Sequence, residues 1–139
     1  KYNEWKIWFE KHFVYLNDDL ILIGFSLGSM FLIKYLSENE VPFKIKLLML
    51  LASPVQLEAG GNDAAGSFQF ALGDISNLAT KSKEILVMHS RDDFVVPYEH
   101  GIKIQAAIPG SELVTFNDKN HFLVEDFPEF IATIKVMGD

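Results

Sequence analysis

The sequence predicts an α/β fold, a parallel sheet with helices on both faces, and two observations carry this prediction. First, short apolar runs occur at residues 20–23 ("LILI"), 45–51 ("IKLLMLL") and 84–89 ("EILVMH"). Strands covered on both faces have this pattern. Second, segments with helical spacing separate these runs, and strands joined by helical crossovers form parallel sheets. The length of 139 residues fits one domain, 1–139.

The other elements follow from apolar spacing and turn signals. Helices are expected over residues 2–13, 27–36, 97–107 and 128–136, and a fourth strand over residues 112–116. Glycines weaken the pattern between residues 55 and 82. We therefore expect this segment to be a short cover within the domain and not a second domain.

Composition narrows the function classes. The chain is 49% hydrophobic and carries a net charge of −7, which gives no support for binding nucleic acid or an anionic membrane. It has no cysteine, so disulfides, thiolate metal sites and a cysteine nucleophile are excluded. The lack of cysteine agrees with a reducing compartment, and a cytoplasmic location is expected. No apolar run reaches the roughly 18 residues that span a bilayer.

Ser26 lies between two glycines at the point where the first strand gives way to a helix. The stretch "GFSLG" spans residues 24–28. A tight strand-to-helix turn would expose the serine hydroxyl, and Gly24 and Gly28 would remove side chains that collide across the turn. The N–H of Leu27 would then be a donor to an oxyanion. The alternative is a glycine-rich turn in which the serine only caps the helix.

A serine nucleophile needs a histidine base and an acid that orients it. Of four histidines, only His121 lies in a loop at the carboxyl end of a predicted strand, where it can reach Ser26. Asp92 and Asp93 follow the third strand and are the acid candidates. The alternatives are a solvated loop histidine and a helix-capping aspartate pair. The order serine, acid, histidine is that of α/β-hydrolases.

Three stretches carry a resemblance to α/β-hydrolases, and more narrowly to small serine hydrolases of the retinoblastoma-binding protein 9 type. "GFSLGS" resembles their nucleophile elbow, "VMHSRDDFVVPYEHG" their H-S-x-x-D-x-x-V-P stretch and "NHFL" their G-H-F histidine loop. In this alignment the acid falls on Asp93 and the base on His121. Two residues depart from the pattern: Phe25 stands where histidine is common, and Asn120 stands where glycine is common.

The resemblance implies a carboxylesterase-like serine hydrolase that cleaves ester, thioester or amide bonds. The reaction would pass through an acyl-enzyme on Ser26, Asp93 and His121, with a small acyl substrate and with no metal or cofactor. An acyl pocket would be lined by Phe25, Phe68, Phe70, Val95 and Phe122, for which core packing is the alternative. Two rivals stay open: an acyltransferase that uses the same triad, and a non-catalytic interaction protein on a hydrolase scaffold.

The resemblance also implies a front segment that this sequence does not show. The family opens with a strand that ends in a loop, followed by a helix. That loop supplies a second oxyanion N–H. Residues 2–13 correspond instead to the helix just before the elbow strand. With about four strands, residues 20–23 would form a bare apolar edge, which is an aggregation liability. We expect either a partial, N-terminally truncated domain or a dimer that covers this edge.

Overall fold

Four parallel strands form one sheet in the order β1-β2-β3-β4. The structure, a computed structural model, describes residues 1–56 and 66–138, so part of the predicted cover, residues 57–65, lies outside the described residues. The strands are β1 (Leu20–Phe25), β2 (Ile45–Leu51), β3 (Ser82–Ser90) and β4 (Glu112–Phe116). The parallel sheet predicted from the sequence is confirmed.

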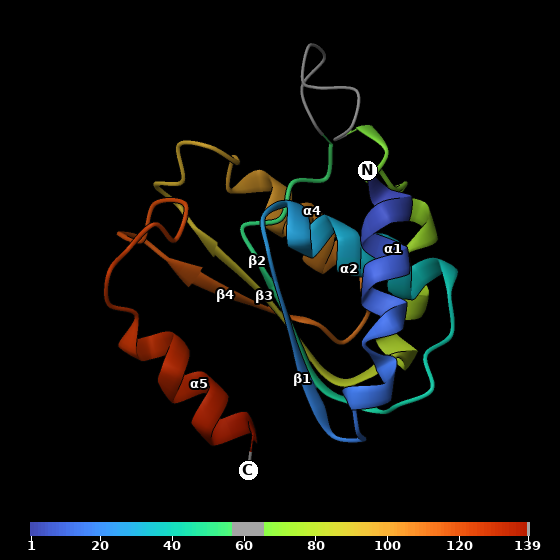
Figure 1. Ribbon diagram of the computed structural model, residues 1–139. Coiled ribbons are helices and arrows are strands. Elements are labelled where there is room, and N and C mark those ends of the chain that lie inside the picture. The colour runs from blue at the N-terminus through green and yellow to red at the C-terminus, as the bar shows by residue number, and fades with distance from the viewer. Residues whose placement is uncertain (57–65, 139) are drawn as a thin grey trace.

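Helices cover both faces of this sheet (Figure 1). On one face lie α1 (Tyr2–Lys11), α2 (Leu27–Glu38) and α4 (Glu99–Ala107), and on the other lies α5 (Pro128–Gly138). Three short 3-10 turns span Phe13–Tyr15, Leu72–Asp74 and Ser76–Thr80. The first helix ends two residues before its predicted end, because the chain tightens into the turn that begins at Phe13.

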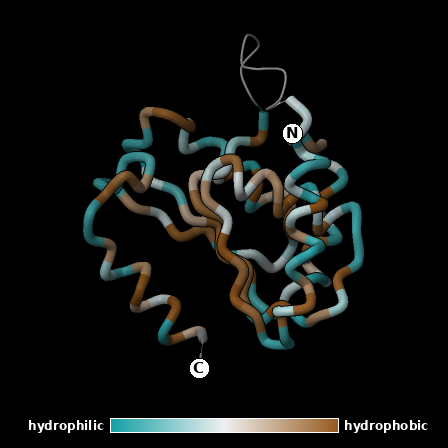
Figure 2. Tube along the Cα trace, viewed as in Figure 1, coloured by the Kyte–Doolittle hydropathy of each residue, from teal (hydrophilic) through white to brown (hydrophobic). Residues whose placement is uncertain are grey.

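Alternate residues of the central strands fill two separate cores. Leu48 and Leu50 of β2 pack with the helices of the first face, whereas Leu47 and Met49 pack on the side of α5. All four are fully buried, and Figure 2 shows the hydrophobic residues gathered along the strands. This two-sided burial explains why residues 47–51 of β2 form a continuous apolar run. Because the strands are parallel, their carboxyl ends lie together at one edge of the sheet.

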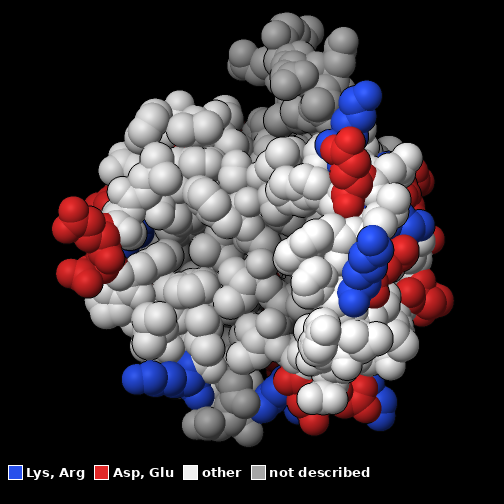
Figure 3. All heavy atoms as spheres, viewed as in Figure 1, with Lys and Arg blue, Asp and Glu red and all other residues white. Residues whose placement is uncertain are grey.

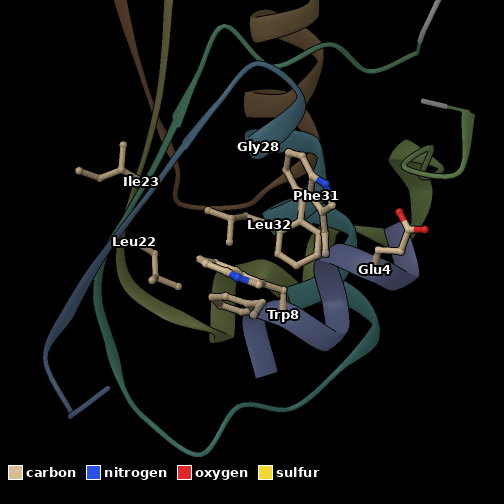
Figure 4. A pocket seen from close by; sticks show the side chains of 9 residues that line it. Glu4, Trp8, Leu22, Ile23, Gly28, Phe31 and Leu32 are labelled. Carbon is tan, nitrogen blue, oxygen red and sulfur yellow. The ribbon is translucent and has the colours of Figure 1, made fainter. Parts of the chain in front are cut away.

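Among the described residues, β1 pairs only with β2 and is therefore an edge strand, as predicted. An apolar groove of about 640 Å³ lies beside it, between α1, α2 and β1. Its lining consists of Glu4, Trp5, Trp8, Phe9, Leu22, Ile23, Gly28, Phe31 and Leu32. Figure 4 shows Trp8 of α1, Leu22 of β1 and Leu32 of α2 turned toward one another, whereas the side chains of Ile23 and Glu4 point away from them. Figure 3 shows charged residues over α1 and at the margins of this face, and few in its middle.

Candidate active site

Ser26 occupies a strained turn between β1 and α2. Its backbone angles are φ 51° and ψ −116°, in the left-handed half of conformational space that side chains other than glycine rarely adopt. Its N–H donates to the carbonyl oxygen of Leu51 at 2.8 Å, and the hydroxyl of Ser29 donates to the same oxygen at 3.1 Å. The end of β2 thus holds the turn in place. Strain of this kind persists where the surroundings fix it, and it concentrates at active sites.

The two glycines of the elbow have different reasons for being there. A Cβ at Gly24 would lie 2.7 Å from the Cα of Ser29 and 2.8 Å from its nitrogen, so the turn closes only with glycine at this position. The same explanation for Gly28 is wrong, because a Cβ there would meet none of the described atoms within 4 Å. Gly28 faces the open groove beside β1.

Asp93 and His121 form a buried pair. The Nδ1 of His121 lies 2.8 Å from the Oδ2 of Asp93, and both side chains are almost fully buried. The second carboxylate oxygen of Asp93 accepts the backbone N–H groups of Val95 and Val96, each at 2.8 Å. These contacts hold the carboxylate in one orientation toward the imidazole. Of the two candidate acids, it is Asp93 and not Asp92 that contacts His121.

Asp92 instead joins the loop after β3 to the loop that carries His121. Its Oδ1 accepts hydrogen bonds from the hydroxyl of Ser90 and from the N–H of Asn120, the latter at 3.0 Å. The Ser90 hydroxyl in turn accepts the N–H of Lys119 at 3.1 Å. The bond from Ser90 is the main reason that the pKa of Asp92 lies below its usual value. Sequence reasoning treated Asp92 as a rival acid or as part of a helix-capping pair, and missed this role.

The histidine loop is strained on both sides of His121. Asn120 has φ 49° and Phe122 has φ 53°, and asparagine tolerates this region better than most residues do. Asparagine is therefore a physically sensible substitute for the glycine that is common at this position of the motif. The ring of Phe122 is held by the rings of Phe116 and Phe127, with centroids 5.7 and 5.2 Å away.

The structure brings His121 to the elbow. The ring of Phe25, the residue before Ser26, lies 5.0 Å from the imidazole of His121 between centroids. Because Nδ1 contacts Asp93, the Nε2 of His121 is the nitrogen left for proton transfer. Leu27 is the first residue of α2, so its N–H has no acceptor within the helix and is available to an oxyanion.

The other three histidines lie in different surroundings. His12 ends α1, with Nδ1 2.7 Å from the carbonyl oxygen of Trp8. The Nδ1 of His100 accepts the N–H of Val55 at 3.1 Å, and burial, followed by the positive charge of Lys103, lowers its pKa. His89 is fully buried in β3, where its Nε2 lies 3.4 Å from the Oδ2 of Asp93. Sequence reasoning placed His89 at a strand end and gave it no role.

The five residues predicted to line an acyl pocket do not lie together. Phe25 and Val95 are exposed, at 41% and 52%. Phe68 is 2% exposed and belongs to the core on the side of α1, against which Phe70 packs. Phe122 packs into the core on the side of α5. Core packing, the alternative, therefore describes Phe68, Phe70 and Phe122, and of the five residues Phe25 and Val95 are exposed.

The large groove beside β1 is not the predicted reaction centre. Gly28 contributes to it from the first turn of α2, but Ser26, Asp93 and His121 are not among its lining residues. The Asp93–His121 pair lies past the ends of β3 and β4, and the groove follows the free edge of β1.

The sheet order, the serine at a strained strand-to-helix turn and the buried aspartate–histidine pair together define an α/β-hydrolase. The model of the serine hydrolase family matches residues 1–134. The chain therefore belongs to the serine hydrolase family. No curated protein matches the chain in sequence. The narrower likeness to the retinoblastoma-binding protein 9 type stays a prediction.

Solved structures share this fold at low sequence identity. The ydeN gene product from B. subtilis matches with a TM-score of 0.84 and 16% identity, over 99% of this chain and 75% of that chain. Alpha/beta hydrolase domain-containing protein 10 from mouse matches with a TM-score of 0.67 and 15% identity, over 88% and 62%. The esterase domain of a Rhodothermus marinus protein matches with a TM-score of 0.56 and 20% identity, over 85% of this chain and 57% of that chain. The chain thus spans less than two thirds of the latter two.

Among the described residues, no helix is both long enough and apolar enough to cross a membrane.

Proposed function

We propose that the protein hydrolyses ester, thioester or amide bonds through an acyl-enzyme formed on Ser26, with Asp93 and His121 as its partners. The observation that carries the proposal is the buried contact of 2.8 Å between Asp93 and His121, beside a serine with φ 51°. A buried carboxylate that orients a histidine next to a half-buried elbow serine is the arrangement that activates a hydroxyl group.

In the proposed reaction each residue has one role, which follows from its contacts. The Oγ of Ser26 attacks the carbonyl carbon as the Nε2 of His121 accepts its proton. The Asp93 carboxylate stabilises the imidazolium that results, and the N–H of Leu27 donates to the oxyanion. His121 then gives the proton to the leaving group. Water repeats the sequence on the acyl-enzyme, releasing the acid and restoring Ser26. Phe25, 41% exposed and in contact with His121, is placed to contact the acyl group.

Hydrolysis of a matched series of p-nitrophenyl esters, thioesters and anilides tests this proposal and ranks the bond types. Release of product is expected for at least one class, and Ser26→Ala is expected to lower kcat on the order of 10⁶-fold, to the background rate. Activity that survives in folded Ser26→Ala would contradict the role of Ser26. Product that depends on an added alcohol or amine would identify the acyltransferase rival. A folded wild-type protein inactive on the whole series would favour the interaction protein.

Dimerisation through residues 20–23 stays a prediction, which the unpaired edge of β1 supports. Sedimentation velocity is expected to show a fraction of dimer that increases with protein concentration. The Ile23→Lys substitution is expected to abolish this dimer. Ile102 of α4 is a matched control, because both isoleucines are 44% exposed and Ile102→Lys leaves the edge intact. A monomer at every concentration, or equal effects of the two variants, would rule out this dimer.

A further inference from the structure

His89 is a fully buried polar side chain that the proposed mechanism does not use. It lies in β3, four residues before Asp93, and none of its surface is exposed. Its Nε2 lies 2.9 Å from the carbonyl oxygen of Val96. A carbonyl oxygen only accepts hydrogen bonds, so Nε2 carries the proton. Its Nδ1 has no hydrogen-bond partner in the described part of the chain. A buried polar atom without a partner is costly, and the side chain that bears it calls for a reason.

Helix α4 is built to admit this imidazole. Gly101 lies inside α4 with no unusual backbone angle, and a Cβ there would lie 2.8 Å from the Nδ1 of His89 and 2.9 Å from its Cβ. Glycine inside a helix costs about 1 kcal/mol relative to alanine. Its presence at 101 is therefore explained by the close approach of His89. The ring of Tyr98 contacts the imidazole from another side, edge to face, with centroids 5.9 Å apart.

The contacts of His89 close a ring around the Asp93 carboxylate. The Oδ1 of Asp93 accepts the N–H of Val96 at 2.8 Å, and the carbonyl of Val96 accepts the N–H of His89. The Nε2 of His89 is also 3.4 Å from the Oδ2 of Asp93, the oxygen that contacts His121. Burial lowers the pKa of His89 despite the nearby Asp93, which favours the neutral imidazole, with its Nε2–H directed at the carbonyl oxygen of Val96.

We propose that His89 is the positioning residue of the Asp93–His121 pair. As a neutral Nε2–H donor it fixes the Val96 carbonyl and limits rotation of the Asp93 carboxylate, so that Oδ2 stays directed at His121. It touches no reacting atom. This inference rests on the proposed function, because the pair that it positions is the proposed acid and base.

Three substitutions separate this role from general packing. His89→Gln keeps an N–H donor near the position of Nε2, and His89→Asn keeps an amide only near Nδ1, so the Val96 carbonyl loses its donor. His89→Leu removes the donor and keeps the bulk. With p-nitrophenyl butyrate, kcat is expected to fall roughly 10-fold to 100-fold in His89→Leu and His89→Asn, by misplacement of the pair. The KM stays unchanged, and His89→Gln restores most of kcat.

A proton spectrum gives a readout that packing alone does not move. The Nδ1 proton of His121, held against Asp93, is expected far downfield and is assigned by its loss in His121→Gln. It is expected to broaden or move upfield in His89→Asn and to persist in His89→Gln. An unchanged signal and an unchanged kcat in folded His89→Asn, or equal losses in His89→Asn and His89→Gln, would overturn the inference. If wild-type protein lacks activity, the proposed function fails, and the spectrum still tests the role of His89.

Discussion

Replacing Asp93 by asparagine is expected to lower kcat roughly 10³-fold to 10⁴-fold while the fold is kept, by analogy with the loss of the acid from a serine protease triad. The backbone contacts give the reason. The Oδ1 position accepts N–H groups from Val95 and Val96, so the amide oxygen of the asparagine takes that place. Its NH₂ group then faces the Nδ1 of His121 as a donor.

The substitution therefore reverses the tautomer of the base. A donor opposite Nδ1 makes that nitrogen an acceptor and places the proton on the Nε2 of His121, which can no longer accept the Ser26 proton. The same NH₂ group also meets the Nε2–H of His89, 3.4 Å from the present Oδ2, as donor against donor. Both effects act on catalysis and leave substrate contacts unchanged, so KM is expected to stay within a few-fold of wild type.

Asp92→Asn is the matched control, since it makes the same chemical change at the neighbouring residue. The hydrogen bonds of Asp92 to Ser90 and Asn120 all end on Oδ1, and an amide oxygen can accept them. We expect a small loss of kcat and a nearly unchanged melting temperature. Steady-state kinetics of the two variants tests the assignment. Equal losses, or a larger loss in Asp92→Asn, would show that Asp93 is not the acid.

Replacing Gly24 by alanine is expected to lower the free energy of unfolding, whereas the same change at Gly28 is not. The new Cβ would lie 2.7 Å from a backbone atom of Ser29, which cannot move without shifting the start of α2. Overpacking of this kind costs roughly 1–3 kcal/mol or more. Because α2 carries the Leu27 N–H and follows Ser26 directly, a shift that relieves the contact also displaces the nucleophile.

Gly28→Ala is the matched partner of this variant. A Cβ at this position meets no described atom within 4 Å, and alanine in a helix is favoured over glycine by roughly 0.5–1 kcal/mol. Chemical denaturation is therefore expected to show a lower free energy of unfolding for Gly24→Ala and an equal or higher one for Gly28→Ala. The opposite ranking would mean that the elbow closes differently from this structure.

The sequence predicts the scaffold well because burial on both faces leaves a direct trace in it. Apart from Lys46, the run at residues 45–51 is apolar without alternation, and the structure shows it at the centre of the sheet with both faces covered. The end of β1 is less visible from the sequence. The strand runs on through Gly24 and Phe25, and glycine is depleted in strands.

The details of the site depend on contacts between loops, and these are less accessible from sequence. Adjacent aspartates at positions 92 and 93 look alike in the chain, and only the geometry separates the partner of His121 from the residue that joins the two loops. Gly28 was predicted to avoid a collision in the elbow, yet it faces open space. Phe68 was predicted to line an acyl pocket, yet it lies in the core. A signal for His89 was present in "VMHSRDD", where a histidine precedes the acid by four residues.

Labelling with a fluorophosphonate probe, followed by intact mass and peptide mapping, tests the central claim most directly. The account predicts one adduct per chain, located on Ser26, which Ser26→Ala eliminates and Asp93→Asn slows. An adduct on another residue, or no adduct on folded wild-type protein, would contradict it.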